Sequence, residues 1–208
     1  MKKYVLAVGF VILSMVAHGA VATSFEEGVH YHELSTNEKE EPVIAEFFSF
    51  YCVSCYHHQT FNDRVQAEWP DILVKHHVST FTPRGFETTM QRAWAAAILL
   101  EVDTAFAEQV FAHNFKQGNQ RNQISSMDTL YEIFSGLGIE RAEVDRIMAG
   151  FQVRSLVRRM QVEEERYSVS GTPTYIVKGR YRMDPRAFRN SEDFFNDYLE
   201  LARYLLKK

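Results

Sequence analysis

Cysteine is scarce in this sequence: Cys52 and Cys55 are the only two among 208 residues. A structural disulfide framework explains them poorly, because a bridge that closes so short a loop removes little entropy from the unfolded chain. Two cysteines at this spacing are better explained by redox chemistry or by metal binding. The shortage of cysteine therefore directs the search for function to one short stretch of the chain.

Other absences narrow the class of protein. Basic residues are not in excess, since 23 Lys and Arg face 27 Asp and Glu, and this balance gives no general electrostatic footprint for nucleic acid. Beyond the N-terminus the sequence has no apolar run long enough to span a membrane, no internal repeat and no low-complexity segment. The composition is 46% hydrophobic and 13% aromatic, which supplies a sizeable core for a folded protein.

The N-terminus has the pattern of a secretory signal peptide. Residues 1–3 are basic, 4–16 are apolar, and 20–22 have the small-x-small form of a cleavage site, so we expect residues 1–22 to be removed. An uncleaved membrane anchor is the alternative, but the apolar run is short and His18 interrupts it. Export predicts an oxidising compartment, and the pattern suits the bacterial periplasm.

The stretch that holds the two cysteines combines a strand and a helix. Val43–Phe50 is rich in Val, Ile and Phe and predicts a buried strand, and Cys52–Trp69 predicts a helix that Pro70 ends. Cys52 then lies at the start of the helix, where unpaired N–H groups and the helix dipole favour its thiolate. Cys55, one turn later, is close enough to close a disulfide with it.

The remaining pattern is that of an α/β protein with a helical insertion. Strands are expected at His30–Leu34 and Ile72–Phe81 before the insertion, and at Thr174–Val177 and Tyr181–Met183 after it. Between them the pattern is helical from Thr89 to Gly118, again from Ser125 to Gly138, and then over Arg141–Gly150 and Val153–Arg166. A final helix is expected with Asn190 or Ser191 as its N-cap. The insertion is placed at residues 82–160.

Several motifs along the chain form a recognisable set: Glu46-Phe-Phe-Ser-Phe-Tyr-Cys52-x-x-Cys55-Tyr56, Gly171–Thr174, Lys178–Tyr181, Phe25–Gly28, Gln91–Ala95 and Phe151–Val157. Together they resemble the DsbA family, the periplasmic thiol:disulfide oxidoreductases with a thioredoxin fold and an inserted helical domain. The likeness covers essentially the whole chain after the signal peptide. It implies a thioredoxin-like domain in two parts, residues 23–81 and 161–208, around the helical insertion.

The resemblance also implies roles for individual residues. Cys52 would be the nucleophile that forms a mixed disulfide with a client, and Cys55 the partner that closes or resolves the bond. Pro173 would form the cis peptide bond that faces the cysteines and turns the backbone edge of Thr172 toward a client strand.

Glu46 and Lys75 match the buried charged pair of the family. A carboxylate in a buried strand is costly unless it is paired. The pair is either purely structural or a proton acceptor for Cys55, and the sequence leaves both interpretations open.

The sequence departs from the family pattern around the cysteines. Val53 and Ser54 stand where the family typically has Pro and His, Thr172 stands where valine is usual, and Gln59 stands where an acid is frequent. Because serine carries no charge, we expect a higher Cys52 pKa and a weaker oxidant than is typical of the family. His57 and His58 raise the question of a metal site, but we interpret them as surface histidines.

The sequence therefore predicts an enzyme, a dithiol oxidase that introduces disulfide bonds into exported cysteine-containing proteins. By resemblance, a DsbB-like, quinone-linked membrane protein would reoxidise it. The chemistry needs no bound cofactor and no metal, and we expect a monomer. Two alternatives remain: a disulfide isomerase or reductase, although no dimerisation domain is visible, and a periplasmic chaperone or metal carrier that retains the cysteines.

Overall fold

A computed structural model describes residues 24–35, 43–79, 81–116 and 123–208 of the chain. Its centre is a five-stranded sheet in the order β1-β5-β4-β2-β3. The strands are β1 Tyr31–Glu33, β2 Ile44–Phe48, β3 Leu73–His77, β4 Thr174–Val177 and β5 Tyr181–Met183. Only β2 and β3 pair in parallel, and the other neighbours are antiparallel. The predicted signal peptide lies outside the described residues.

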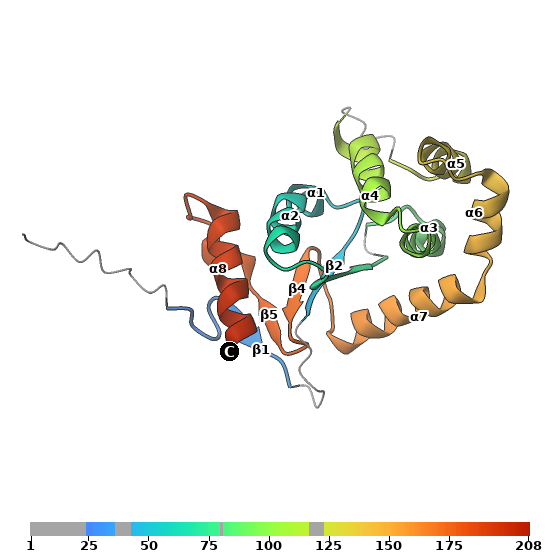
Figure 1. Cartoon of the computed structure of the whole chain (residues 1–208). Coiled ribbons are helices and arrows are strands. Elements are labelled where there is room, and N and C mark those ends of the chain that lie inside the picture. Colours follow the sequence, from blue (N-terminus) through green and yellow to red (C-terminus); the bar gives the residue numbers. More distant parts are fainter. Residues whose placement is uncertain (1–23, 36–42, 80, 117–122) are drawn as a thin grey trace, which may run out of the picture.

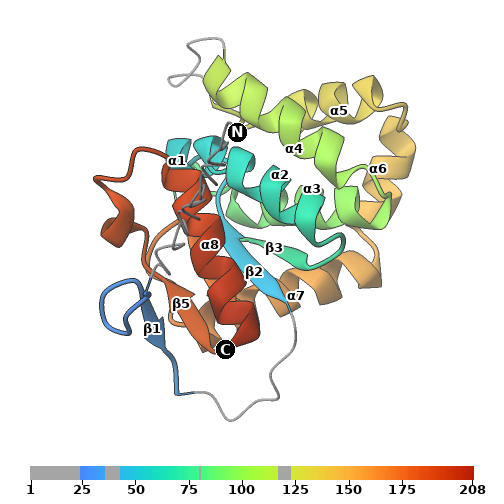
Figure 2. The same ribbon diagram turned by 60° about the vertical axis from the view of Figure 1, so that its left-hand side comes forward.

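Helices pack on the sheet, and a group of them lies beyond its β3 edge (Figure 1). The helices are α1 Val53–His57, α2 Gln59–Glu68, α3 Glu87–Leu99, α4 Asp103–Phe111, the π-helix η1 Ala112–Lys116, α5 Met127–Gly136, α6 Arg141–Met148, α7 Phe151–Arg166, the 3-10 helix η3 Pro185–Phe188 and α8 Phe194–Lys207. Helices α2 and α8 lie together on one face of the sheet, and α7 runs along the opposite side (Figures 1 and 2). Among the described residues no helix is long and apolar enough to cross a membrane.

The hydrophobic core has two main parts. One fills the space between the sheet and helices α2 and α8, and its large members include Phe61, Tyr175 and Tyr198. The other lies within the helical region between β3 and β4, and it extends back to the end of β2 through Phe48 and Phe50. Both cysteines belong to this second part of the core.

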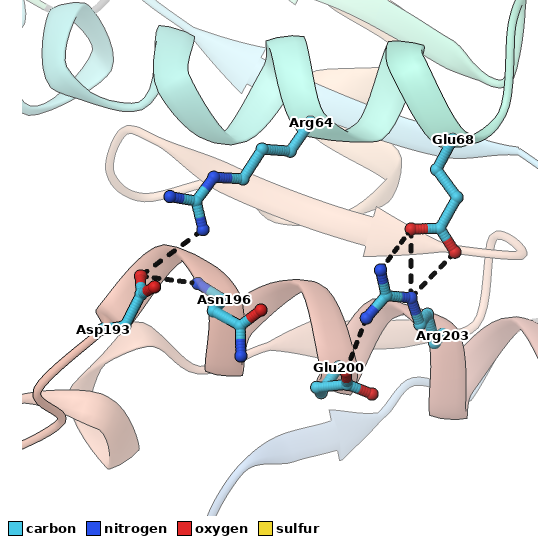
Figure 3. A network of polar contacts seen from close by, with 6 residues as sticks. All are labelled: Arg64, Glu68, Asp193, Asn196, Glu200 and Arg203. Carbon is cyan, nitrogen blue, oxygen red and sulfur yellow. Dashed lines mark hydrogen bonds and ion pairs between the residues drawn. The ribbon is translucent and has the colours of Figure 1, made fainter.

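Polar contacts join α2 to α8 along their outer edge (Figure 3). The Arg203 guanidinium donates to both carboxylate oxygens of Glu68, with Nε at 2.8 and 3.0 Å, and it also pairs with Glu200. Near the start of α8, Arg64 lies 3.4 Å from Asp193. These contacts fix how the final helix packs on α2, which begins four residues after Cys55 in the sequence.

The start of α8 differs from the prediction. The N-cap is Asp193, whose carboxylate accepts from the backbone N–H of Asn196 at 3.1 Å, and not Asn190 or Ser191. The Ser191 hydroxyl instead accepts from the Asp193 N–H and donates to Asp197 at 2.7 Å. The helix thus begins at least two residues later than expected, and Ser191 holds the backbone of the N-cap residue Asp193 in place.

Three predicted elements have different bounds in the structure. The helix expected over Cys52–Trp69 is interrupted at His58, and the one expected over Thr89–Gly118 is interrupted after Leu99, where Glu101 adopts a positive φ of 57°. The third strand ends at His77 and not at Phe81. Helix α7 continues to Arg166, so the expected boundary at residue 160 falls inside a helix. The division into domains stays a prediction.

Candidate active site

Cys52 lies at the N-terminus of α1, four residues after β2 ends. It is the N-cap residue, with an extended backbone (φ −102°, ψ 113°), and its Sγ accepts a hydrogen bond from the backbone N–H of Cys55 at 3.4 Å. Both cysteines are free thiols; Cys52 is 8% exposed and Cys55 is fully buried. The strand-to-helix position that the sequence predicts for the pair is the one observed.

The loop before β4 lies against Cys52. The Thr172–Pro173 peptide bond is cis, and the Cys52 thiol donates to the backbone carbonyl of Thr172 at 3.4 Å, across 120 positions of sequence. The Thr172 hydroxyl is buried and has no hydrogen-bond partner among the described residues. It is therefore free to donate to the sulfur once Cys52 ionises.

The surroundings of Cys52 favour its thiolate and lower its pKa to about 6. The main cause is a hydrogen bond from the Cys55 thiol to the Cys52 sulfur, and partial burial opposes it. The Thr172 hydroxyl and the backbone N–H groups of Cys55 and Ser54 stabilise the thiolate further. Val53 and Ser54, between the cysteines, are both exposed and carry no charge. The low pKa of Cys52 therefore arises from hydrogen bonds and not from a charged residue in the motif.

Cys55 has the opposite character. Its burial raises the pKa of the thiol far above the usual range, and the nearby charges of Cys52 and Glu46 act in the same direction. The inner cysteine is therefore protonated when the pair is reduced, whereas the outer one is a thiolate near neutral pH.

A row of three polar side chains crosses the sheet beneath the cysteines. In the strand register Glu46 on β2 lies opposite Lys75 on β3 and opposite Tyr175 on β4. Lys75 Nζ is 3.5 Å from Glu46 Oε2, and the Tyr175 hydroxyl is 3.1 Å from Oε1. Asn62 on α2 donates from Nδ2 to Oε2 at 2.9 Å. Glu46, which is fully buried, is thus paired and hydrogen-bonded, as such a carboxylate requires.

Gln59 connects this row to the cysteines. Its Nε2 donates to the backbone carbonyl of Cys55 at 3.0 Å, and its Oε1 accepts from Lys75 Nζ at 3.1 Å. An acid at this position would add a second negative charge beside Lys75, whereas the glutamine adds none.

The interpretation of the neighbouring histidines was wrong for one of them. His57 is exposed, but His58 is buried, with its ring stacked on Tyr175 at 5.7 Å and with aromatic rings of α8 around it. Burial lowers the pKa of His58 to about 4. Among the described residues no three His, Cys, Asp or Glu side chains are grouped so that they could hold a metal ion.

Two residues of the site, Asn62 and Tyr175, were not predicted from the sequence. A signal for Asn62 was present, since it follows Phe61 and precedes Val65 on the apolar stripe of its helix, where a polar residue is unusual. No local signal marks Tyr175, because tyrosine is common in buried strands. Only the register of β4 against β2 places its hydroxyl on Glu46.

Comparison with known proteins agrees with this geometry. The family model described as a DSBA-like thioredoxin domain matches residues 43–200. The thiol:disulfide interchange protein DsbA of Haemophilus influenzae is 29% identical over 212 residues, and that of Escherichia coli K12 is 29% identical over 216 residues, with 100% of both chains covered in each case.

Crystal structures of DsbA proteins have the same fold. The structure from Klebsiella pneumoniae superimposes with a TM-score of 0.79 at 26% identity, covering 90% of this chain and 100% of the other. The structure from Proteus mirabilis gives 0.77 at 29% identity, with 89% and 98% covered. The predicted α/β class, a thioredoxin fold with a helical insertion, is confirmed. Since the family model spans most of the chain and the cysteine pair stands at the start of α1, the chain belongs to the DsbA family of thiol:disulfide oxidoreductases.

Proposed function

We propose that this protein is a dithiol oxidase that introduces disulfide bonds into exported proteins through Cys52 and Cys55. The observation that carries the proposal is the contrast between the two thiols: the pKa of Cys52 is lowered to about 6 and that of Cys55 is raised. A stabilised thiolate favours the reduced form of the enzyme, and an enzyme whose reduced form is stabilised is an oxidant.

The reaction begins with the Cys52–Cys55 disulfide. A client thiolate attacks the sulfur of Cys52, forms a mixed disulfide and displaces Cys55 as a thiolate, which takes up a proton. A second client thiolate then attacks the client sulfur of the mixed disulfide and displaces Cys52 as a thiolate. The client is oxidised by two electrons and the enzyme is reduced by two. The low pKa of Cys52 assists the last step, because a more stable thiolate leaves faster.

The loop of Thr172 and Pro173 supports client binding beside Cys52. The carbonyl of Thr172 accepts from the Cys52 thiol in the reduced protein, so it is free to accept from a client once Cys52 is in the disulfide, and proline adds no competing N–H. An extended client segment can pair with this backbone edge and bring its sulfur to Cys52. Val53 and Ser54 are exposed next to it and leave the approach open.

Glu46 is the proton acceptor for Cys55 in this proposal. It lies close enough for its charge to raise the pKa of Cys55, and Lys75, 3.5 Å away, balances that charge. The buried thiol needs such a partner, because it must lose its proton each time the disulfide reforms.

The cellular setting follows from family membership and from the expected signal peptide. We propose that the protein works in the bacterial periplasm on cysteine-containing exported clients. A DsbB-like membrane protein linked to quinones would accept its electrons. Catalysis uses no bound cofactor, and the working form is a monomer.

The redox equilibrium of the Cys52–Cys55 pair against glutathione tests the direction of the reaction. We expect an oxidising potential, although a less oxidising one than the family typically has, and rapid oxidation of a reduced peptide that carries two cysteines. A reducing, thioredoxin-like potential would instead support the reductase or isomerase alternative. Cys52→Ser should abolish the oxidation, and if it does not, the chaperone or metal-carrier alternative gains support.

A further inference from the structure

The hydroxyl of Tyr175 lies between two acceptors. It is 3.1 Å from Glu46 Oε1 and 3.0 Å from Asn62 Oδ1. A phenol has one proton, so it donates to only one of these oxygens at a time. Tyr175 and Glu46 are fully buried and Asn62 is 2% exposed, so water does not compete for these bonds at the hydroxyl.

The cluster therefore has two satisfied arrangements. When Glu46 is ionised, Tyr175 donates to it, and Asn62 Nδ2 donates to its other oxygen at 2.9 Å. When Glu46 carries a proton on Oε1, that proton needs an acceptor. Tyr175 then turns its own proton to Asn62 Oδ1 and accepts from Glu46, while the bond from Asn62 Nδ2 is kept. A buried carboxyl that gains and loses a proton is thus hydrogen-bonded in both states.

We propose that Tyr175 and Asn62 are positioning residues that let Glu46 take up the proton of Cys55 and give it back. This rests on the proposed function. In the step, the Cys55 thiol and the Glu46 carboxylate become the Cys55 thiolate and the Glu46 carboxylic acid, and no electrons move. The Cys55 thiolate then attacks the Cys52 sulfur of the mixed disulfide, forms the Cys52–Cys55 bond and releases the partner's thiolate.

A cavity of about 320 Å³ lies next to the cluster. Glu46 does not line it, but its two partners Asn62 and Lys75 do, together with Gln59. A space of this size with polar walls admits water. Tyr175 does not line it. In the proposal the proton therefore reaches solvent past Asn62 and Lys75, which border the cavity, and not past Tyr175.

Other titratable groups surround the cluster and define the background of any pH profile. The groups nearest to it are Cys52 and Cys55 at the start of α1, His58 between α1 and α2, Lys75 on β3 and Tyr198 on α8. The charged side chains that line the cavity are Asp63, Asp103, Glu108, Lys116 and Lys75 itself. His58 has a pKa lowered by burial to about 4, and the pKa of Tyr198 is raised by burial, so both stay neutral near pH 7.

The test is the rate at which Cys55 resolves a mixed disulfide between Cys52 and glutathione, measured on the full chain from about pH 5 to 9. We expect Tyr175→Phe to slow resolution about tenfold at pH 6, and by less than about twofold at pH 9, where hydroxide can remove the proton of Cys55 directly. Asn62→Leu, which removes the alternative acceptor and also the Nδ2 donor to Glu46, should change the profile in the same direction.

Tyr198→Phe is the matched control. Tyr198 is also buried, its ring lies 5.8 Å from that of Tyr175, and it makes no contact with Glu46 among the interactions of the described residues. We expect it to keep the wild-type profile. The proposal is overturned if Tyr175→Phe and Asn62→Leu keep that profile, or if both slow resolution equally at every pH. A wild-type protein that does not oxidise a dithiol would instead overturn the proposed function.

Discussion

The two ends of the cysteine pair differ more than their separation suggests. Cys52 lies at the open N-terminus of α1 beside a cis-proline loop, and N–H and hydroxyl donors surround its sulfur. Cys55, one helical turn away, is fully buried and lies close to the negative charge of Glu46. Donors lower the pKa at the outer end, and loss of solvation raises it at the inner end. A single turn of helix thus separates a reactive thiolate from a protected thiol.

This contrast shows that two different parts of the molecule control the two halves of the reaction. The outer end governs exchange with the client, because it sets how easily Cys52 leaves. The inner end governs closure of the disulfide, because Cys55 must first lose its proton, which in our proposal passes to Glu46 in the polar row across the sheet. The two ends remain coupled through the hydrogen bond from the Cys55 thiol to the Cys52 sulfur, so only changes that leave this bond intact should affect one end alone.

Chemical labelling of the reduced protein tests the difference between the two thiols most directly. At pH 7 we expect iodoacetamide to modify Cys52 at least about 10³-fold faster than Cys55, because only the thiolate reacts. Mass spectrometry of timed samples measures both rates. In Cys52→Ser the remaining Cys55 should become reactive only when the protein is unfolded. Similar rates at the two sulfurs would refute the contrast.

Removing the charge at the inner end should cost stability. Glu46→Ala leaves Lys75, which is 13% exposed, without its partner, and we expect a loss of about 3 kcal/mol in the free energy of unfolding. Urea unfolding of the oxidised protein measures it. Glu46→Gln keeps the shape and part of the hydrogen bonding, so its loss should be smaller. Equal losses would show that the ion pair alone, and not the shape of the side chain, matters here, and no loss in Glu46→Gln would show the reverse.

The lowered pKa of Cys52 predicts that the free energy of unfolding of the reduced protein has a pH dependence that the oxidised protein lacks. In the folded state the pKa of Cys52 is about 6, whereas the unfolded thiol titrates near its ordinary value of about 8.5. The unfolded state therefore binds more protons between these values, and stability rises with pH there. The gain is complete above the unfolded pKa and is lost as pH falls through about 6.

The measurement is the difference in unfolding free energy between reduced and oxidised protein from about pH 5 to 9. Groups other than the two thiols cancel in this difference. Cys55 does not, because burial raises its pKa, so it lowers the stability of the reduced form above the ordinary thiol pKa of about 8.5. The contribution of Cys52 is therefore read below that pH. The difference should change in favour of the reduced form as pH rises, and a flat difference would contradict a lowered Cys52 pKa.

A charge placed between the cysteines sharpens the role of the outer end. Ser54→His should lower the Cys52 pKa, because an imidazolium stabilises the adjacent thiolate. Each unit by which the pKa falls should raise the reduction potential by about 30 mV. Thiolate absorbance and the glutathione equilibrium measure the two effects. Ser54→Ala is the control for loss of the hydroxyl. A lowered pKa with an unchanged potential would separate thiolate stability from oxidising power.

The smallest effect is expected far from both cysteines. Arg203→Ala removes the contacts of Figure 3 between α8 and Glu68, and since the side chain is 30% exposed we expect a loss of about 0.5 kcal/mol. The loss should be the same in the oxidised and the reduced protein, and iodoacetamide labelling should not change. A difference between the redox forms would show that the surface network communicates with the active site.

Much of the site could be predicted because its signals are local. The apolar run before Cys52 and the helical pattern after it define the strand-to-helix position without any tertiary information. Glu46 also stands out within its own strand. Family resemblance then supplied Lys75 and Pro173, which no local pattern singles out.

The rest depends on contacts between distant segments. The role of Tyr175 follows from the register of β4 against β2, 129 positions apart, and the burial of His58 depends on aromatic residues of α8. The break after Leu99 has no glycine or proline to mark it, since Glu101 itself takes the left-handed conformation. Tertiary packing overrides local preference at such points.

The cysteines pack into the hydrophobic core of the helical region, together with Phe50, Trp94 and Phe111. This membership limits how the molecule can be re-engineered. A shortened chain that joined β3 directly to β4 would keep all five strands and the redox motif, yet it would strip one wall from Cys55 and admit water to the inner sulfur. The helical region is thus an inseparable component of the redox centre, and a transplant of the centre to another scaffold must carry these helices with it.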